Sequence, residues 1–561
     1  MDDRVEDAYL RVCENLFKQA DLERGAWQRV VSKVMPKLIA TATLHEENAK
    51  DENERVCSQA NIDILKLASA HMSYIYPAGH QWFKFESWKA ADPDSTEDES
   101  DSWFAYASDV SRREIERSNF YSELHSAIID SCTTGSGLMH IGIDDNNDVL
   151  VFNHVPTGTF GVAQNAQHVV DTAARKFKYT PAQLEEAFGL EAMTNEMREA
   201  YHDAGRRYDF KEAVEVWHLV APSRDFYGVN DHTRVFPYVS VYLSPRDKKI
   251  LKEEQMEEFP YVCFRFVSYG NSPYGVSPLL AIEGDIDALM KAEDVLTLLG
   301  QRAALPSVIV PPDMVGEVDL RAGGQTVVPM QYINAQVPRE WAMPGNYQIG
   351  IDQVERLNKK IDDALYVSVL QIISQTDRYM TATEVNSREA EKLMTFTPVF
   401  TQAQVDGRQM MNRIFALLVR AQKLNLDKMP DELIQVEQLD DAQNLKLLTP
   451  KMSYIGRLAQ AMERIQSSAA DGFLAKLMQV SSATQDPTGL ALINWQKYWR
   501  KEAYSCGMPA CYLKSEEQVQ QEMQELAQMR EQQQMQQAAL AESEAARNNA
   551  AAINYRQQYQ K

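Results

Sequence analysis

The stretch YGNSPYGVSPLLAIEGDIDALMKAEDVL, residues 269–296, contains the clearest helix start in the chain. Ser277 and Pro278 are typical of the N-cap and the first position of a helix. The apolar residues that follow recur at intervals of three, four and seven, as on one face of an amphipathic helix. They are Leu279, Ile282, Ile286, Leu289, Leu296 and Leu299. We therefore predict a helix over residues 277–304.

A segment punctuated by proline and glycine follows this helix. Residues 305–345 contain short β-prone runs, and a second amphipathic pattern occupies residues 346–373. The apolar positions of the second pattern are Val354, Leu357, Ile361, Leu365 and Ile372. The predicted layout is helix, small β-rich tip, helix. Because so small a tip cannot bury a core of its own, we expect neighbouring copies of the chain to stabilise it.

A polar loop and a long helix come next. The loop SQTDRYM, residues 374–380, carries Asp377 and Arg378 side by side. Thr381 can cap the following helix, and Glu384 completes a capping box.

The long helix contains one residue that should interrupt it. Pro398 should kink or stop the helix, because it removes a backbone hydrogen bond. The helical pattern resumes at 406–424, and ELIQVEQL (432–439) predicts a short strand.

The part before residue 277 mixes helical and strand-like patterns. Helical periodicity occurs twice in residues 5–78, and further helices are predicted within 103–137 and 181–204. The acidic segment 90–101 is predicted to be a loop. Strand-like runs are HQWFKFE (80–86), the hairpin LMHIGIDDNNDVLVFNHV (138–155), EVWHLVA (215–221), VFPYVSVYL (235–243) and YVCFRFVSYG (261–270). This pattern predicts an α+β fold that is helical in its larger part.

The C-terminal part is predicted to be helical, over 440–505 and again beyond Ser515. Ser515 and Gln518 form a capping box, and a thin apolar stripe runs through Val519, Met523, Leu526 and Met529. A packed helix and a solvated tail remain equally open here. We expect order up to about residue 540 and fraying over 541–561.

The charge balance limits the possible partners. The chain has 57 lysines and arginines against 80 acidic residues, a net charge of −23. Proteins that grip nucleic acid through its phosphates show the opposite balance, so any contact with DNA must be local. The charge also argues against an anionic membrane, and no apolar run approaches the ~18 residues that a span needs. The acidic N-terminus has no signal-peptide character.

Cysteine and histidine usage argues against a disulfide framework and a metal site. Six cysteines are scattered over the chain, as is typical of a reduced compartment. Only Cys506 and Cys511 lie close together, and all ten histidines lie at or before His232. We expect no metal ion and no cofactor.

No catalytic motif emerges from the sequence. There is no GxxxxGK[ST], TTGSGLMHIG lacks the third glycine of a dinucleotide site, and DDNND (144–148) lacks the later calcium ligands. HEENA (45–49) and GNSPYG (270–275) each miss a required residue. Carboxylate groups such as Asp362–Asp363 and Glu283/Asp285/Asp287 are interpreted as a solvated helix face. We therefore predict a structural protein and not an enzyme.

Five stretches stand in order along the chain: PAGHQWFKF (77–85), SNFYSELHSAIIDSCTTGSGLMHIG (118–142), residues 269–296 quoted above, MTATEVNSREAEKLM (380–394) and CGMPACYLKSEEQVQQEMQE (506–525). This series resembles the portal proteins, or head-to-tail connectors, of short-tailed double-stranded DNA bacteriophages. The correspondence spans about residues 10–530. The third stretch carries the entry motif of the family in Tyr274, Gly275, Ser277 and Pro278.

The resemblance implies a ring of twelve copies with wing, stem, clip and crown regions. It implies a wing at 1–276, a first stem helix at 277–304, a clip at 305–345 and a second stem helix at 346–373. A tunnel loop at 374–380, a long kinked helix returning to the wing at 381–440 and crown helices at 441–540 follow.

The resemblance also suggests which residues meet DNA. In the family the tunnel loop faces DNA at the narrowest point of the channel, so we expect Arg378 to point at the phosphates, next to Asp377 and Tyr379. Lys359, Lys360 and Lys291 are weaker candidates on the stem. The alternative is that Arg378 pairs with Asp377 or with a carboxylate of a neighbouring copy and never touches DNA.

Partners and location follow from the same resemblance. The implied partners are double-stranded DNA in transit, the major capsid protein, scaffolding protein, terminase large subunit, tail adaptor and internal core proteins. The implied location is one capsid vertex of a virion that is assembled in the host cytoplasm. Two other classes remain open: another virion ring or adaptor protein, and a cell-wall hydrolase carried in the virion.

Overall fold

The computed structural model describes residues 3–36, 38, 56–88, 98–144, 148–226, 236–304, 308–310, 347–367, 382–439 and 442–455, with isolated positions between 312 and 340 and between 474 and 536. The chain divides into two compact units, residues 1–459 and 460–561. All helices and strands named below belong to the first unit.

A five-stranded antiparallel sheet forms one layer of the first unit, in the order β4-β5-β6-β7-β8. Its strands are β4 (Phe160–Gln164), β5 (Val170–Tyr179), β6 (Val214–Pro222), β7 (Tyr238–Ser244) and β8 (Lys249–Met256). The sequence predicted β6 and β7. It missed β8 because the lysines and glutamates of this edge strand hide the apolar alternation.

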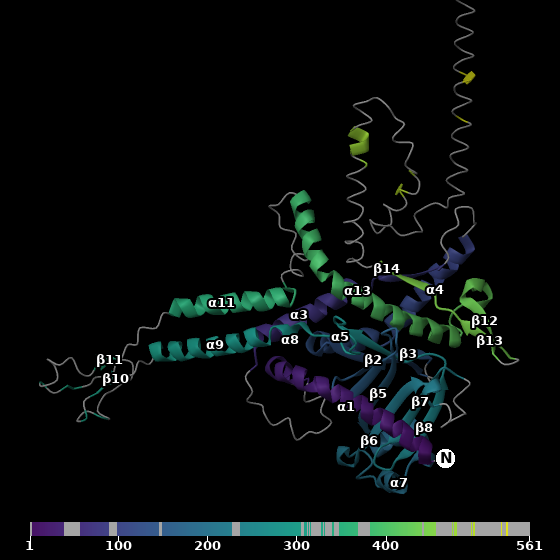
Figure 1. The fold of residues 1–561 in the computed structure, drawn as a ribbon, viewed down its shortest axis with the longest axis horizontal. Helices are drawn as coiled ribbons and strands as arrows, with labels where there is room; N and C mark the ends of the chain where they lie inside the picture. The colour runs from purple at the N-terminus through teal and green to yellow at the C-terminus, as the bar shows by residue number, and fades with distance from the viewer. Residues whose placement is uncertain are drawn as a thin grey trace, which may run out of the picture. The chain divides into compact units, whose positions relative to one another are not determined.

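Helix α1 (Asp3–Val34) lies across one face of this sheet (Figure 1). Its apolar stripe, including Tyr9, Cys13 and Leu16, packs on Leu219 and Val241 of the sheet, and all five side chains are buried. Burial of a large apolar side chain contributes about 1.5–3 kcal/mol, so this stripe holds the helix on the sheet.

A smaller sheet, ordered β3-β2-β9, carries the predicted hairpin. Its strands are β2 (Ser136–Asp144), β3 (Val149–Val155) and β9 (Tyr261–Arg265). Helix α5 (Phe120–Thr134) packs against β2 and β3, and α3 (Ser58–Ile75) packs against α5. Helix α4 (Asp98–Arg117) begins inside the acidic segment predicted to be a loop, which is a correction.

Helices α6 (Pro181–Ala192) and α7 (Asn195–His202) confirm the helical prediction for 181–204. They pack on the sheet through a small core that contains Leu184, Met197 and Val216. A 3-10 turn (Phe210–Glu212) follows and leads into β6.

The predicted helix at 277–304 is present as two pieces, α8 (Pro278–Ala281) and α9 (Glu283–Ala304). Helix α11 (Tyr347–Ala364) packs along α9, and the short strands β10 (Val308–Ile309) and β11 (Arg339–Glu340) pair between them in the chain (Figure 1). The helix-tip-helix layout is therefore present in the described residues.

The second of these helices ends earlier than predicted. α11 stops at Ala364, because Tyr366 adopts a positive φ of 59° that no helix interior accommodates. Leu365 is buried in the turn that follows, and Ile372 lies outside the described residues.

Helix α13 (Ala382–Arg420) begins directly after Thr381, as predicted. Pro398 does not stop it, and Figure 1 shows a single helix that changes direction along its length. A proline removes only one hydrogen bond, and packing of the buried Phe396, Val399 and Phe400 compensates for that loss.

The segment after α13 corrects a second prediction. Residues 442–454 were predicted to be helical but form two strands, β13 (Ala442–Leu447) and β14 (Lys451–Tyr454). β13 pairs with the predicted strand β12 (Ile434–Leu439), and β14 pairs with β1 (Phe83–Glu86) far earlier in the sequence. The long-range partner explains the error at β14, because no local pattern reveals it, whereas β13 forms a hairpin with its immediate neighbour β12 that the sequence analysis missed.

Several predictions fall on residues that the structure does not describe. They concern the tunnel loop at 374–380, the side chains of Thr381 and Glu384, most of the clip, and nearly all of the C-terminal part from 456 onward. Among the described helices none is long and apolar enough to cross a membrane.

Candidate functional site

The chain enters α8 by passing against the end of α5. Gly135 caps α5 in the left-handed conformation with φ of 97°. A Cβ on Gly135 would lie 2.7 Å from the carbonyl carbon of Gly275 and 3.0 Å from the Ser277 nitrogen. A Cβ on Gly275 would meet the Gly135 carbonyl oxygen and lie 3.0 Å from the Cβ of Arg265. Only glycine fits at either position, so the two backbones can touch.

Ser277 fixes the start of α8, as the sequence predicted. Its Oγ accepts a hydrogen bond from the Leu279 N–H (3.1 Å) and donates one to the Cys132 carbonyl (2.8 Å). Pro278 occupies the first helical position, where the missing N–H costs nothing. One buried hydroxyl therefore caps α8 and ties it to α5.

Tyr274 connects the same junction to the five-stranded sheet. Its hydroxyl oxygen accepts a hydrogen bond from the Val162 N–H of β4 at 3.1 Å. Burial raises the pKa of Tyr274, which keeps the phenol neutral. The Gly275 N–H donates to Ser136 Oγ of β2 at 2.8 Å. The four motif residues thus set the direction in which α8 and α9 leave the two sheets.

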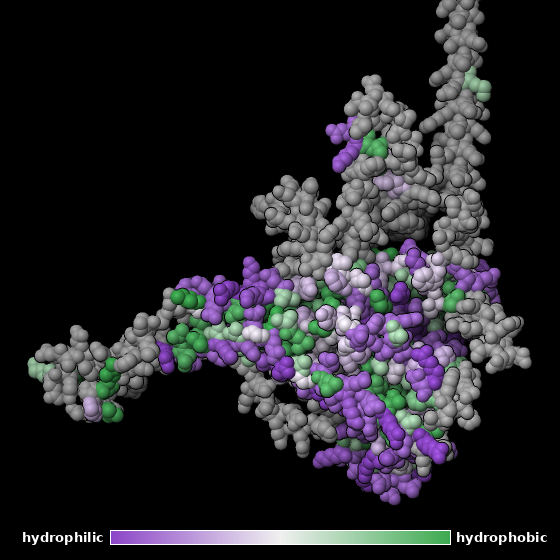
Figure 2. Space-filling model, viewed as in Figure 1, coloured by the Kyte–Doolittle hydropathy of each residue, from purple (hydrophilic) through white to green (hydrophobic). Residues whose placement is uncertain are grey.

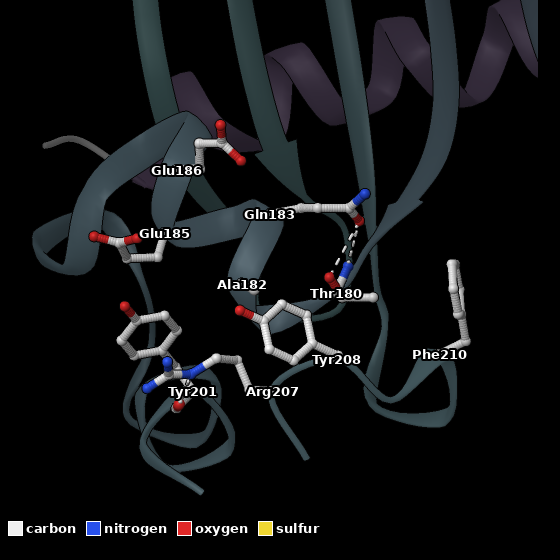
Figure 3. Close-up of a pocket in the computed structure, with 9 residues that line it drawn as sticks. All are labelled: Thr180, Ala182, Gln183, Glu185, Glu186, Tyr201, Arg207, Tyr208 and Phe210. Atoms are coloured by element: carbon white, nitrogen blue, oxygen red, sulfur yellow. Dashed lines mark hydrogen bonds between the residues drawn. The ribbon is translucent and has the colours of Figure 1, made fainter. Parts of the chain in front are cut away.

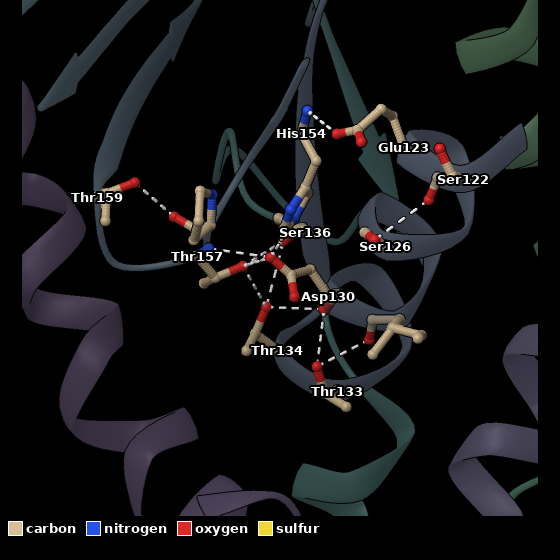
Figure 4. Close-up of polar contacts among 12 residues, drawn as sticks. Ser122, Glu123, Ser126, Asp130, Thr133, Thr134, Ser136, His154, Thr157 and Thr159 are labelled. Carbon is tan, nitrogen blue, oxygen red and sulfur yellow. Dashed lines mark hydrogen bonds and ion pairs between the residues drawn. The ribbon is translucent and has the colours of Figure 1, made fainter. Parts of the chain in front are cut away.

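Asp130 of α5 holds the turn that follows β3 (Figure 4). Its Oδ2 accepts hydrogen bonds from the Thr157 N–H and Oγ1 (both 2.9 Å) and lies 2.8 Å from His154 Nε2. Glu123 accepts from the backbone N–H of His154 at 2.9 Å. The Thr157 hydroxyl bonds the carboxylate and not the imidazole, so this group lacks the nucleophile–base contact of a hydrolase and acts as a structural clamp.

The acidic residues at the start of α9 are paired, which corrects their interpretation as a solvated face. Glu283 Oε1 lies 3.3 Å from Arg29 Nε, and Asp287 Oδ1 lies 2.6 Å from Lys33 Nζ. Both basic residues belong to the last turns of α1. These ion pairs link α1 to α9, an arrangement that charge spacing within one helix cannot reveal.

The predicted DNA-channel residues divide into three groups. Arg378, Asp377 and Tyr379 lie outside the described residues. Lys291 on α9 and Lys359 on α11 are exposed and make no ion pair within the described part of the chain.

Lys360 differs from these two lysines. Its Nζ lies 3.2 Å from Asp285 Oδ1 on the neighbouring helix α9. The structure therefore places Lys360 in a link between α9 and α11, where it is paired with Asp285.

A carboxylate pair that sequence reasoning missed connects α3 to α11. Gln59 Nε2 donates to Asp63 Oδ2 (2.9 Å) and to Asp362 Oδ1 (2.8 Å). Asp63 is fully buried and also accepts from Lys66 Nζ at 2.9 Å. Burial and the neighbouring Asp63 raise the pKa of Asp362. Asp362 therefore belongs to a packed contact, and the partners are too far apart in sequence for any spacing rule to join them.

Asp406 anchors α13 to β9. Its Oδ2 accepts from the Arg265 N–H (2.9 Å) and its Oδ1 from Gln402 Nε2 (2.9 Å). Burial raises the pKa of Asp406 to about 7, since these bonds and the Arg265 guanidinium only partly offset the loss of water. Arg265 also lies against Gly275 through its Cβ. Asp406 of α13 therefore holds a residue that packs on the junction.

The cysteines and metal-ligating side chains form no further site in the described residues. Cys13, Cys57, Cys132 and Cys263 are buried free thiols. No group of three or more His, Cys, Asp or Glu side chains in the described part of the chain could hold a metal ion.

Comparison with known proteins identifies the family. The model of the family described as "Bacteriophage head to tail connecting protein" matches residues 8–513. The portal protein of Salmonella phage epsilon15 is 24% identical over 437 residues, which cover 74% of this chain and 77% of the relative. The probable portal protein of Bordetella phage BPP-1 is 22% identical over 468 residues, covering 81% and 79%.

Among solved structures, a chain of the virion of a native gene transfer agent particle is 12% identical and gives a TM-score of 0.31. The match covers 74% of this chain and 86% of that chain. A likeness this distant does not assign a role to any element. The family match spans most of the chain and includes the junction described above. The chain belongs to the bacteriophage head-to-tail connecting protein family, with portal proteins among its relatives.

Proposed function

We propose that twelve copies of this chain form a closed ring at one capsid vertex, through which double-stranded DNA is packaged and later ejected. The observation that carries this proposal is the α9–α11 pair. Val295 and Leu298 on α9 and Ile349 on α11 are 57%, 49% and 62% exposed. Large apolar side chains gathered on one projecting element favour contact with further protein.

Figure 2 supports this interpretation, because apolar surface interrupts the polar surface along the α9–α11 projection. A neighbouring copy would cover these side chains in a closed ring, since cyclic assemblies repeat one heterologous contact. The stem in this proposal consists of α8, α9 and α11, and the clip consists of residues 305–345.

The charge of the stem suits a channel that DNA passes through without sticking. Helices α9 and α11 together carry nine acidic and five basic residues. Each phosphate contact adds salt-dependent affinity, so a fully basic wall would hold the strand. Four of these carboxylates, Glu283, Asp285, Asp287 and Asp362, are engaged with other side chains, so the proposed wall carries a nearly balanced charge. Such a wall with few exposed cations, among them Lys291 and Lys359, permits sliding.

The proposed retaining contact is Arg378 in the loop 374–380, with Asp377 and Tyr379 beside it. Twelve copies would place a ring of arginines at the narrowest point. Particles that carry Arg378→Ala should package DNA but lose it more readily than wild type at low ionic strength, where an arginine–phosphate contact is strongest, measured as nuclease-sensitive genome per particle. Wild-type retention, together with an Arg378 salt bridge between subunits in the ring structure, would contradict this role.

The further partners follow from the same proposal. The clip would dock the terminase large subunit and then the tail adaptor. The wing and crown regions would contact the major capsid, scaffolding and internal core proteins as the ring nucleates a head in the host cytoplasm. The alternatives of an adaptor or a cell-wall hydrolase are not favoured by a family match over residues 8–513.

The first experiment is mass photometry of the purified chain with negative-stain imaging. Twelve copies of the 63.8 kDa chain give about 766 kDa in a ring with a central hole. A protein that stays at 63.8 kDa in the presence of scaffolding protein would contradict the proposal. Val295→Asp should shift the population toward single chains, whereas Leu22→Asp, an 82% exposed site on α1, is the matched control.

A further inference from the structure

The cleft between α6 and the loop that follows α7 encloses about 520 Å³ (Figure 3). Its side chains define no single binding point, because Glu186 points away from the cleft and Phe210 lies at the far end from Glu185. A buried carboxyl group at which several elements do meet lies instead on helix α13.

The turn of α13 formed by residues 402–407 packs closely against α3 and β14. Tyr76, which caps α3, and Tyr454 of β14 both donate their hydroxyls to the Ala403 carbonyl, at 3.1 and 3.2 Å. A Cβ on Gly407 would lie 3.0 Å from the Tyr76 hydroxyl oxygen and closer still to that of Tyr454, so glycine permits this approach. We call residues 402–407 the seat of α13.

Asp406 ties the seat to β9 and is cut off from water. It is 1% exposed, and its Oδ2 and Oδ1 accept hydrogen bonds from the Arg265 N–H and from Gln402 Nε2, both at 2.9 Å. The Arg265 guanidinium lies 3.9 Å from Oδ1, and no described residue forms a hydrogen bond with its buried Nε. Two hydrogen bonds and one cation at this distance compensate poorly for a charge removed from water, which favours the neutral carboxyl group.

Gln402 allows the neutral carboxyl group to keep its hydrogen bonds. The Gln402 Oε1 accepts from the Ser268 hydroxyl at 2.9 Å while its Nε2 donates to Asp406. If the amide turns over, Oε1 accepts the O–H of a protonated Asp406 and Nε2 donates to the Ser268 oxygen, because amides and hydroxyls both donate and accept. Ser268 is exposed, so this chain of hydrogen bonds ends at solvent. The chain therefore fits both charge states of Asp406.

The other ionisable groups close to Asp406 add no strong charge to its surroundings. Burial raises the pKa of Tyr76, Tyr454 and Cys263, so these three side chains are neutral near pH 7. Arg408 on α13 is exposed. Arg265 is therefore the buried cation that acts on this carboxyl group.

The remaining elements around α13 carry charges that already have partners. Glu114 of α4 pairs with Lys423 at 2.6 Å, and Glu258, shortly before β9, pairs with Arg413 at 2.7 Å. Burial lowers the pKa of His140 in β2 and keeps the imidazole neutral. The balance at Asp406 thus rests on burial against the pull of Arg265.

We propose that the seat of α13 is a proton-dependent lock, which closes on β9 when Asp406 takes up a proton from water and loosens when Asp406 returns that proton to water. In the closed form the Asp406 O–H donates to Gln402 Oε1, and the second oxygen still accepts the Arg265 N–H. In the loosened form the carboxylate regains contact with water. This inference goes beyond the ring and does not depend on it.

The direction of the pH dependence follows from the pKa. Burial raises the pKa of Asp406 from 3.8 to about 7, so the folded chain holds this proton more tightly than the unfolded chain does. The stabilisation by the lock is therefore complete in acid and is lost as the pH rises through about 7.

Hydrogen–deuterium exchange of the full chain, corrected for the pH dependence of free amides, tests the lock. Protection of amides within residues 399–411 should fall about 30-fold between pH 5.5 and pH 8, as expected for pKa values of about 7 and 3.8 in the closed and open forms. Asp406→Asn retains the hydrogen bonds of the neutral form, since its Nδ2 donates to Gln402 Oε1 and its Oδ1 accepts the Arg265 N–H. Its protection should not vary over this pH range.

A second variant tests the electrostatics without altering Asp406. Arg265→Met removes the cation that favours the carboxylate, so the midpoint of the fall should move to higher pH. Asp171→Asn is the matched control, because Asp171 of β5 is another buried carboxyl group with a raised pKa, and it should leave the fall at residues 399–411 intact. A flat wild-type profile, equal slopes in the wild type and Asp406→Asn, or a midpoint that Arg265→Met does not move would overturn the proposal.

Discussion

The close approach of Gly135 and Gly275 leads to a quantitative prediction. Gly135→Ala adds a Cβ 2.7 Å from the Gly275 carbonyl carbon, well inside ordinary contact, at a residue whose φ is 97°. The left-handed conformation costs a non-glycine residue about 1–2 kcal/mol, and overpacking costs about 1–3 kcal/mol more. The expected loss is about 2–5 kcal/mol in the free energy that holds this junction closed.

Hydrogen–deuterium exchange read by mass spectrometry measures that loss locally. Amides of residues 128–140 and 278–286 should exchange at least about 30-fold faster in Gly135→Ala, since each 1.36 kcal/mol is a factor of ten. Gly275→Ala lacks the φ penalty and should fall between this variant and the wild type.

Gly284→Ala is the matched control. It is the second residue of α9, and a Cβ there has no atom within 4 Å. Alanine has the higher helix propensity, by about 1 kcal/mol in a helix interior, so exchange in the first turns of α9 should slow by up to about fivefold. The reasoning is refuted if Gly135→Ala and Gly284→Ala exchange alike, or if Gly275→Ala proves the most damaging of the three.

Three further predictions concern the start of α8, the buried histidine of α3 and the α1–α9 contact. Ser277→Ala removes the cap of α8 and leaves the buried Cys132 carbonyl without its hydroxyl donor. The same exchange assay should therefore report a loss of about 1–3 kcal/mol in the free energy of opening. A loss under about 0.5 kcal/mol would contradict the role of the hydroxyl. Burial lowers the pKa of His71 to about 4, so below pH 6.5 the unfolded chain binds the extra proton and stability falls as the pH drops toward 4. His71→Phe should reduce this slope by up to about 1.4 kcal/mol per pH unit in urea titrations, with parallel curves above pH 7. A double-mutant cycle on Lys33 and Asp287 should give a coupling of about 0.5 kcal/mol that weakens in 1 M salt, and zero coupling at low salt would exclude the ion pair from the α1–α9 contact.

Local signals in the sequence predicted much of the fold. The start of α8 was predictable because the cap residues Ser277 and Pro278 act within one turn. The β2–β3 hairpin was predictable because its two apolar runs flank an Asp/Asn turn. The errors at Ala364 and at 451–454 arose where a single left-handed residue, Tyr366, or a remote partner decided the backbone.

The candidate site was predictable only in part. The motif at 274–278 identified the junction, but the roles of Tyr274 and Gly275 depend on Val162 and Gly135, which no spacing rule connects to them. Lys360 was a candidate for DNA, and its position opposite Asp285 became visible only once α11 lay along α9.

The sequence by itself therefore determined where α8 and α13 begin, which helix faces are apolar, and to which family the chain is similar. Those features depend on interactions within a few residues of one another and on the order of motifs. The tertiary structure alone decided which charges are neutralised, such as Glu283 by Arg29, and which carboxylates meet, such as Asp63 and Asp362. A charge pattern in the sequence indicates only which face of a helix a side chain occupies. The energy of an ion pair depends on the distance between the charges and on their burial, and both are set by the tertiary fold.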